Sequence, residues 1–277
     1  MNIYKEAIKA SMRLAKSIAL SGALMSFSSG VNAKVDDYEK FITKDCAALF
    51  KEAGAGDKII DAWNSQSKNM TKILSSEMVQ GMKNGTLTRK KFDELYMRPD
   101  VFYLYKLGLA IEERAAREPS EDDKKNIMMF ATTLLGFKEK LPKYNLNAES
   151  ILMDQKCNHH IHFVTHKTTI NELYISIITD MMPYVCFADY LHHTMEGEKN
   201  EWRGYVKNFV EKNGTYPSFS PKLTTYFKIV NNILDKGVVS SEDSKKLFAE
   251  GVGFEAYFIE EAMKGGLKKS IQSGCFR

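Results

Sequence analysis

The first candidates for chemistry are Cys186 and Tyr190, in the stretch MMPYVCFADYLHH at residues 181–193. Their spacing of four would place both side chains on one face of a helix. A cysteine thiolate is a nucleophile, and a site that uses one must lower the pKa of the thiol or supply a base. The pair can therefore be a nucleophile with its partner, and the same spacing also suits an ordinary buried thiol.

Glu255 is the candidate acid, in the stretch FAEGVGFEAYFIEEAM at residues 248–263. A buried carboxyl group with a raised pKa can protonate a leaving group. Aromatic residues surround Glu255, whereas Glu260 and Glu261 supply charges for the solvent, so Glu255 can point inward. The alternative interpretation is a solvated helix charge.

The six histidines fall into two groups that could ligate a metal ion. His162 and His166 are spaced by four, and so are Asp189 and His193. Each pair could present two ligands on one helical face. The alternative is that these histidines are solvated or cap helix ends, and we expect no cofactor on that interpretation.

The elements that must position these residues are helices. Residues 92–118 carry a broad apolar stripe that ends in charged residues, and Pro99 predicts a helix start or a kink within it. Ser120 and Ser240 or Ser241 are expected N-caps. No alternating segment is long enough for a sheet, so the fold class is all-α, a helical bundle. Further helices are predicted at 57–84, 121–141, 168–195, 201–211, 221–236 and 241–264.

The N-terminus has the pattern of an export signal, which we assign to residues 1–33. Four basic residues precede the uncharged, mostly apolar run 17–27, and Val31-Asn32-Ala33 is the small-x-small pattern of a cleavage site. We expect cleavage after Ala33 and an exported protein, periplasmic or secreted. The alternative is an amphipathic helix that is retained.

Composition limits the possible partners and domain organisation of the mature chain, residues 34–277. The signal carries a net charge of +3 out of the total of +4, so the mature chain is nearly neutral. It therefore lacks the excess of positive charge that is typical of nucleic-acid binding. No long apolar run follows the signal, so no stable membrane anchor is expected after cleavage. About 244 residues, from a chain that is 44% hydrophobic, suffice for a single domain.

Four cysteines lie in this mature part, Cys46, Cys157, Cys186 and Cys275. Export would expose them to oxidation, and an even number permits two disulfides in three possible connectivities. Four reduced thiols are the alternative.

The order of several motifs resembles that of the TenA/thiaminase II family. Segment 77–110 is similar to the opening motif of the family, and the segment SIITDMMPYVCFADY is similar to its apolar helix with a Pro and a nucleophilic Cys. The segment NEWRGYVKNFV is similar to the Trp segment of the family, and the helix that contains Glu255 is similar to its closing motif. The matching residues are Gly85, Leu87, Phe92, Tyr96, Asp100, Tyr103, Leu104, Trp202, Glu255, Phe258 and Ala262. The resemblance covers roughly residues 63–264.

This resemblance implies a heme-oxygenase-like helical fold with a buried site for an aminopyrimidine. It assigns Asp100 as acceptor of the ring amine, Tyr103 as a lining residue, Glu255 as acid/base and Phe258 as the stacking wall. It also implies a homo-oligomer. Core packing for Tyr103 and Phe258, and helix capping for Asp100, are the alternative interpretations.

The position of the nucleophile depends on the register of one helix. In the family the Cys directly follows the Pro, whereas here Tyr184 follows Pro183 and Cys186 comes two residues later. Two residues rotate a helix by about 200°, so Tyr184 and the Cys186–Tyr190 pair cannot both face the site. We favour the register set by Pro183, in which the hydrolase chemistry of the family should be absent.

Three functions follow. The first is an aminopyrimidine hydrolase of the thiaminase II type, acting on thiamin or its degradation products through Glu255 and Cys186. The second is a small-ligand binding protein, or a different enzyme, that lost the Cys nucleophile. The third is a di-iron oxidase that uses the histidine pairs, since the implied fold also hosts such enzymes.

Overall fold

Helices make up the secondary structure that the computed structural model describes, which covers residues 38–147, 155–210 and 221–267. No strand occurs in these three segments, so the all-α prediction is confirmed. The predicted signal peptide, residues 1–33, and Cys275 lie outside the described residues. Export and the cleavage site therefore stay predictions.

The helices follow one another along the chain with short connections. Those before the first gap are α2 (Tyr38–Lys40), η1 (Phe41–Cys46), α3 (Ala47–Glu52), α4 (Asp57–Asn64), α5 (Ser67–Leu74), α6 (Glu77–Lys83), α7 (Arg89–Phe92), η2 (Asp93–Met97), α8 (Arg98–Ala116), α9 (Glu121–Leu135) and η3 (Gly136–Tyr144). The later ones are α10 (Gln155–His162), η4 (Phe163–Lys167), α11 (Ile170–Thr194), α12 (Arg203–Val210), α13 (Pro221–Asp235) and α14 (Ser241–Met263).

Local sequence signals explain several of these boundaries. Pro99 lies in the first turn of α8, directly after the π-helical turn η2, so the predicted helix start or kink falls where the helix changes from π-helical to α-helical. The Ser120 and Ser240 side chains cap α9 and α14 as predicted. The single helix predicted at 57–84 is wrong, because the chain turns after α4 and again before Ser76, which caps α6.

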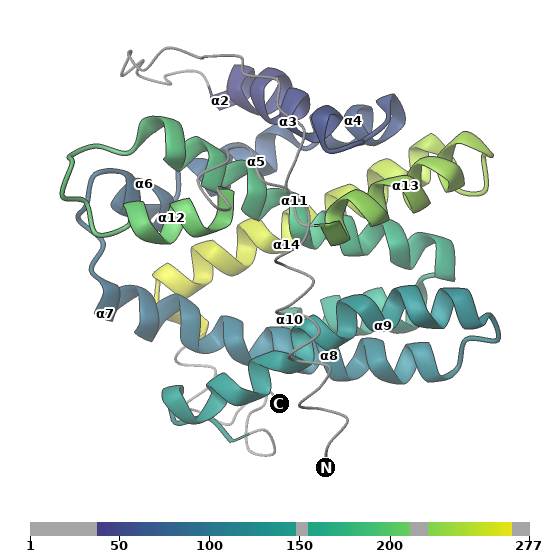
Figure 1. The fold of residues 1–277 in the computed structure, drawn as a ribbon. Helices are drawn as coiled ribbons and strands as arrows, with labels where there is room; N and C mark the ends of the chain where they lie inside the picture. Colours follow the sequence, from purple (N-terminus) through teal and green to yellow (C-terminus); the bar gives the residue numbers. More distant parts are fainter. Residues whose placement is uncertain (1–37, 148–154, 211–220, 268–277) are drawn as a thin grey trace, which may run out of the picture. The chain divides into compact units, whose positions relative to one another are not determined.

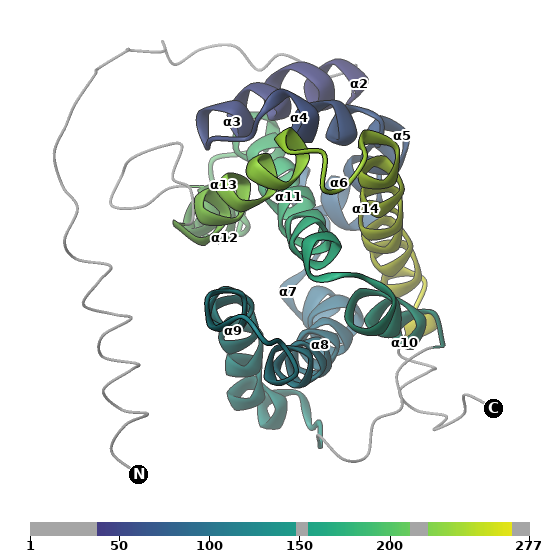
Figure 2. The same ribbon diagram turned by 90° about the vertical axis from the view of Figure 1, so that its right-hand side faces the viewer.

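The long helices α11 and α14 form the centre of the packing. α11 packs against α12, α13 and α14, and α14 also packs against α4, α5 and α10. The next major pair is α8 and α9, an antiparallel hairpin that Figure 1 shows beneath α11 and α14 and that Figure 2 shows nearly end on. Side chains from η2, α8, α11 and α14 can therefore meet in the interior. None of the described helices has the length and apolar character needed to span a membrane.

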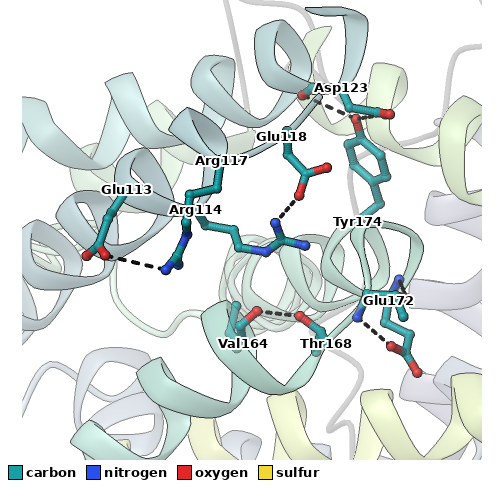
Figure 3. Close-up of polar contacts among 10 residues, drawn as sticks. Glu113, Arg114, Arg117, Glu118, Asp123, Val164, Thr168, Glu172 and Tyr174 are labelled. Carbon is teal, nitrogen blue, oxygen red and sulfur yellow. Dashed lines mark hydrogen bonds and ion pairs between the residues drawn. The ribbon is translucent and has the colours of Figure 1, made fainter. Parts of the chain in front are cut away.

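Polar contacts fix the start of α11 against the α8–α9 turn (Figure 3). The Tyr174 hydroxyl donates to Asp123 Oδ1 at 2.7 Å. Thr169 and Glu172 form a capping box at the first turn of α11. Nearby, Arg114 and Glu118 form an ion pair with little solvent exposure at the end of α8. Of these contacts, the Tyr174–Asp123 hydrogen bond joins α11 to α9, and the other two stabilise the ends of α11 and α8.

A disulfide joins the N-terminal part of the bundle to the middle of α11. Cys46, at the end of η1, is bonded to Cys186, and their Cα atoms are 5.5 Å apart. Both residues are fully buried. One pairing among those that the sequence left open is thereby assigned, and Cys157 is a buried thiol outside it.

Candidate functional site

Glu255, Tyr184 and Tyr96 form a hydrogen-bonded chain in the interior, from α14, α11 and η2 respectively. The Tyr184 hydroxyl donates to Glu255 Oε2 at 2.8 Å, and it lies 2.7 Å from the Tyr96 hydroxyl. Glu255 is 2% exposed, so the prediction that it points inward holds. Three elements that are distant in sequence thus converge on one carboxyl group.

This geometry decides the register of α11. Tyr184, the residue directly after Pro183, reaches Glu255, as the favoured register requires. Cys186 is bonded to Cys46, and a sulfur atom in a disulfide cannot be a thiolate, so Cys186 could act as the predicted nucleophile only after reduction. Tyr190 also lies elsewhere: its hydroxyl accepts a hydrogen bond from Gln80, and its ring packs on Phe41.

Asp100 and Tyr103, both on α8, contribute buried polar atoms without a partner. Asp100 is 5% exposed and Tyr103 is 2% exposed. Asp100 Oδ1 and the Tyr103 hydroxyl have no hydrogen-bond partner among the residues described. Because buried polar groups in proteins are nearly always hydrogen-bonded, such atoms indicate a place where a bound molecule supplies the missing partner.

Phe258 provides an apolar wall beside these polar groups. Its ring centroid is 5.9 Å from that of Tyr96 and 5.5 Å from that of Tyr103. Phe258 lies three residues after Glu255 on α14, so the two side chains share one face of that helix. The structure therefore brings together Asp100, Tyr103, Tyr184, Glu255 and Phe258 from the sequence-based set, and it leaves Cys186 and Tyr190 outside.

Burial controls the ionisation of this cluster. Burial raises the pKa of Glu255 well above its ordinary value, the Asp180 charge raises it further, and the Tyr184 hydrogen bond opposes the shift. Burial also raises the pKa of Asp100 to about 7, against the attraction of Lys140. The pKa of Tyr184 is raised well above 10, chiefly by burial and then by Glu255. These shifts favour the protonated form of Glu255, and they keep Tyr184 a neutral phenol at neutral pH.

Sequence patterns missed two charged residues of the interior. These are His160 on α10, which is buried, and Asp180 on α11, whose carboxyl oxygens are buried. His160 is 1% exposed, with Nε2 at 3.6 Å from Asp180 Oδ1 and Nδ1 at 3.5 Å from Glu250 Oε1. Its ring stacks on Phe254 with centroids 4.1 Å apart. Burial disfavours the imidazolium, but the two carboxylates outweigh it and raise the pKa of His160 to about 9. The one available signal was that Asp180 precedes Tyr184 by one helical turn.

A hollow of about 330 Å³ opens on the outer side of α10 and α14. It is lined by Lys156, His159, Glu250, Phe254 and Tyr257, among others. Glu250 and Phe254 also contact His160, so a single layer of side chains separates the hollow from the buried imidazole.

The residues proposed for a metal site do not assemble into one. The His162 and His166 rings stack with centroids 4.8 Å apart, and His193 Nε2 lies 3.5 Å from Asp189 Oδ1. Across the described parts of the chain, no three side chains of His, Cys, Asp or Glu are arranged to hold a metal ion. The geometry gives the di-iron hypothesis no set of ligands.

The fold and the site together define an all-helical protein with a buried polar cluster between its central helices. It is similar to a TenA homologue from P. horikoshii OT3, with a TM-score of 0.59 and 19% identity over 75% of this chain and 99% of that one. It is also similar to a TenA homologue from Pyrococcus furiosus, with a TM-score of 0.52 and 14% identity over 73% of this chain and 98% of that one.

A third solved structure, described as a TenA-like thiaminase from Sulfolobus solfataricus P2, has a TM-score of 0.54 and 17% identity over 76% of this chain and 97% of that one. No protein-family model and no curated protein matches the sequence. The chain therefore has the helical fold of these TenA proteins, as the sequence resemblance implied.

Proposed function

We propose that this protein binds a small aminopyrimidine-like molecule at the cluster formed by Asp100, Tyr103, Tyr184, Glu255 and Phe258. The observation that carries the proposal is the pair of buried polar atoms without a partner, Asp100 Oδ1 and the Tyr103 hydroxyl. An amino group on a heteroaromatic ring offers N–H donors to both, and the flat ring fits against an aromatic wall.

The TenA-like thiaminase among the similar structures supports this choice of ring, because thiamin contains an aminopyrimidine. The carboxyl group of Glu255 and the Tyr184 hydroxyl would then act as hydrogen-bond partners of the ring nitrogens. The disulfide at Cys186 argues for binding without cysteine-dependent hydrolysis.

Hydrolysis of the aminopyrimidine by another route is the second candidate. The raised pKa of Glu255 favours it, since a buried carboxyl group with a raised pKa is suited to protonate a leaving group. This route needs a nucleophile other than Cys186, such as water. We place simple binding first because the Tyr184 phenol, which stays neutral, is a poor nucleophile.

The test measures binding of 4-amino-5-aminomethyl-2-methylpyrimidine by calorimetry, together with turnover of this compound and of thiamin. We expect binding without turnover by the oxidised protein. Asp100→Asn and Glu255→Gln should each weaken binding by about tenfold, because each replaces a carboxyl partner of the ring with an amide and leaves a buried polar group mismatched. Glu260→Gln is the matched control, because Glu260 is on the same helix and exposed to solvent.

Two results would contradict the proposal. If the pyrimidine does not bind to the wild-type protein, the site does not recognise this ring. If reduction of the disulfide produces turnover that Cys186→Ser abolishes, the chain is a cysteine hydrolase after all.

A further inference from the structure

Asp180 is a buried carboxylate that the proposed ring recognition does not use. It lies on α11 one helical turn before Tyr184, so both side chains face the same direction. Its side chain is 9% exposed, and neither Oδ1 nor Oδ2 accepts a hydrogen bond from the described residues. Burying a carboxylate in this way is unfavourable unless donors or a cation compensate it.

The neighbours of Asp180 provide only part of that compensation. His160 Nε2 is 3.6 Å from Asp180 Oδ1, too far for a good hydrogen bond, and the same imidazole also faces Glu250. The charge of Asp180 raises the pKa of both Tyr103 and Glu255, so these three groups lie within electrostatic range of one another. The Tyr103 hydroxyl and the Asp180 oxygens, which have no hydrogen-bond partner among the described residues, both lie near His160. Its ring centroid is 6.5 Å from that of Tyr103, and its Nε2 forms the ion pair with Asp180.

The charges in this region are unequal. The imidazole of His160, whose pKa is raised to about 9, is a single positive charge that faces two carboxyl groups, those of Asp180 and Glu250. A ligand that carries a positive charge would correct this imbalance, and a neutral ligand would not.

We infer that Asp180 accepts a positively charged amino group of the ligand, in a subsite beside the residues that hold the ring. An ammonium group has three donors, which suits the two free carboxylate oxygens of Asp180 and the Tyr103 hydroxyl. His160, on α10, contacts the same carboxyl group through Nε2. The inference rests on the proposed function for the position of the ring, whereas the charge of the ligand is a separate claim.

The experiment compares ligands that differ only in charge. The first pair is 4-amino-5-aminomethyl-2-methylpyrimidine, which is cationic at pH 7.5, and its neutral 5-hydroxymethyl analogue. The second pair lacks the pyrimidine and consists of benzylamine and benzyl alcohol. Calorimetry on the oxidised full-length protein measures all four affinities for the wild-type chain, for Asp180→Asn and for Asp189→Asn.

Asp189→Asn is a matched control because Asp189 is also a buried aspartate on α11 with a histidine neighbour. Nine residues separate it from Asp180, which places it about half a turn away, on the opposite face of the helix.

We expect the wild-type protein to bind the cationic member of each pair at least about tenfold more tightly than the neutral one. Asp180→Asn should abolish that preference and change the affinity for the neutral members by less than about twofold, which also shows that the variant is folded. Asp189→Asn should keep the wild-type preference.

Equal wild-type affinities within the pairs would overturn the inference without the need for any variant, and so would a preference that survives in Asp180→Asn. If benzylamine binds through Asp180 but neither pyrimidine binds, the proposed function fails and the amine subsite stands. If the pyrimidines bind equally well, the proposed function stands and the amine subsite fails. If none of the four binds, both fail.

Discussion

At the residue scale, the side chain of α11 that reaches Glu255 determines which chemistry the site can do. A cysteine at that position would be a nucleophile, whereas Tyr184 is a phenol whose pKa is raised well above 10 by burial and then by Glu255. A neutral phenol donates a hydrogen bond well and attacks carbon poorly. With Tyr184 at this position, the site is suited to recognition or to acid/base chemistry.

Asp100 provides a prediction about stability, because its pKa of about 7 lies above the ordinary value of 3.8. Between these two values the folded protein holds a proton that the unfolded chain releases, so the free energy of unfolding falls as the pH rises through this range. Asp100→Asn removes the titration. We expect this variant to be more stable than the wild type at pH 8 by about 1–3 kcal/mol, and nearly equal to it at pH 4.

Urea unfolding at the two pH values measures this difference. Asp235→Asn, at an exposed position at the end of α13, is the control and should show no comparable dependence on pH. A stabilisation by Asp100→Asn that is equal at both pH values would mean that the carboxyl group does not titrate in the range that burial implies.

At the element scale, the sequence predicts the helices well where periodicity and caps agree. The helices that carry the site, α8, α11 and α14, follow from their apolar stripes, from Pro99, and from Ser240 as a cap. α10 was not predicted, because its polar, histidine-rich sequence has no clear apolar stripe. His160 is buried only because α8, α11 and α14 pack around it, and no local pattern contains that information.

The residues of the site could also be predicted only in part. Asp100, Tyr103, Glu255 and Phe258 could be named from motif order, and Tyr184 from its place after Pro183. The pairing of Cys46 with Cys186 could not be predicted, because it joins positions 140 residues apart in the chain. Sequence spacing alone left three connectivities equally open.

This disulfide also leads to a prediction about the N-terminal helices. It closes a loop of 140 residues and ties η1 to α11, so its loss should release conformational entropy mainly in the unfolded chain. We expect Cys46→Ser to lower the free energy of unfolding by about 2–4 kcal/mol. The pyrimidine affinity should stay within about twofold, because neither sulfur contacts the Glu255 cluster.

Urea unfolding under non-reducing conditions, with calorimetry for the ligand, checks both statements. Dithiothreitol should destabilise the wild type and leave Cys46→Ser unaffected. A wild-type protein whose unfolding is insensitive to the reductant would show that the two thiols are not bonded in solution.

At the scale of the whole molecule, the disulfide agrees with the export that the N-terminal sequence predicts. Structural disulfides persist mainly in oxidising compartments, and reduced thiols are the rule in the cytosol of most organisms. The fold gives Cys46 and Cys186 the positions of a buried, long-range cross-link rather than of a reactive surface pair. We therefore propose that the mature protein works outside the cytoplasm, in the periplasm or after secretion.

The cleavage site provides the test of this proposal. Signal peptidase recognises small residues at the last and third-to-last positions of the signal, here Ala33 and Val31, and accepts varied residues between them. Intact-mass analysis of the protein from the periplasm or medium of a bacterial host should show a chain that starts at Lys34. Ala33→Leu should leave the signal attached, whereas Asn32→Gln, at the unconstrained position, should be processed normally. A full-length chain with reduced cysteines that stays in the cytoplasm would instead support the retained amphipathic helix.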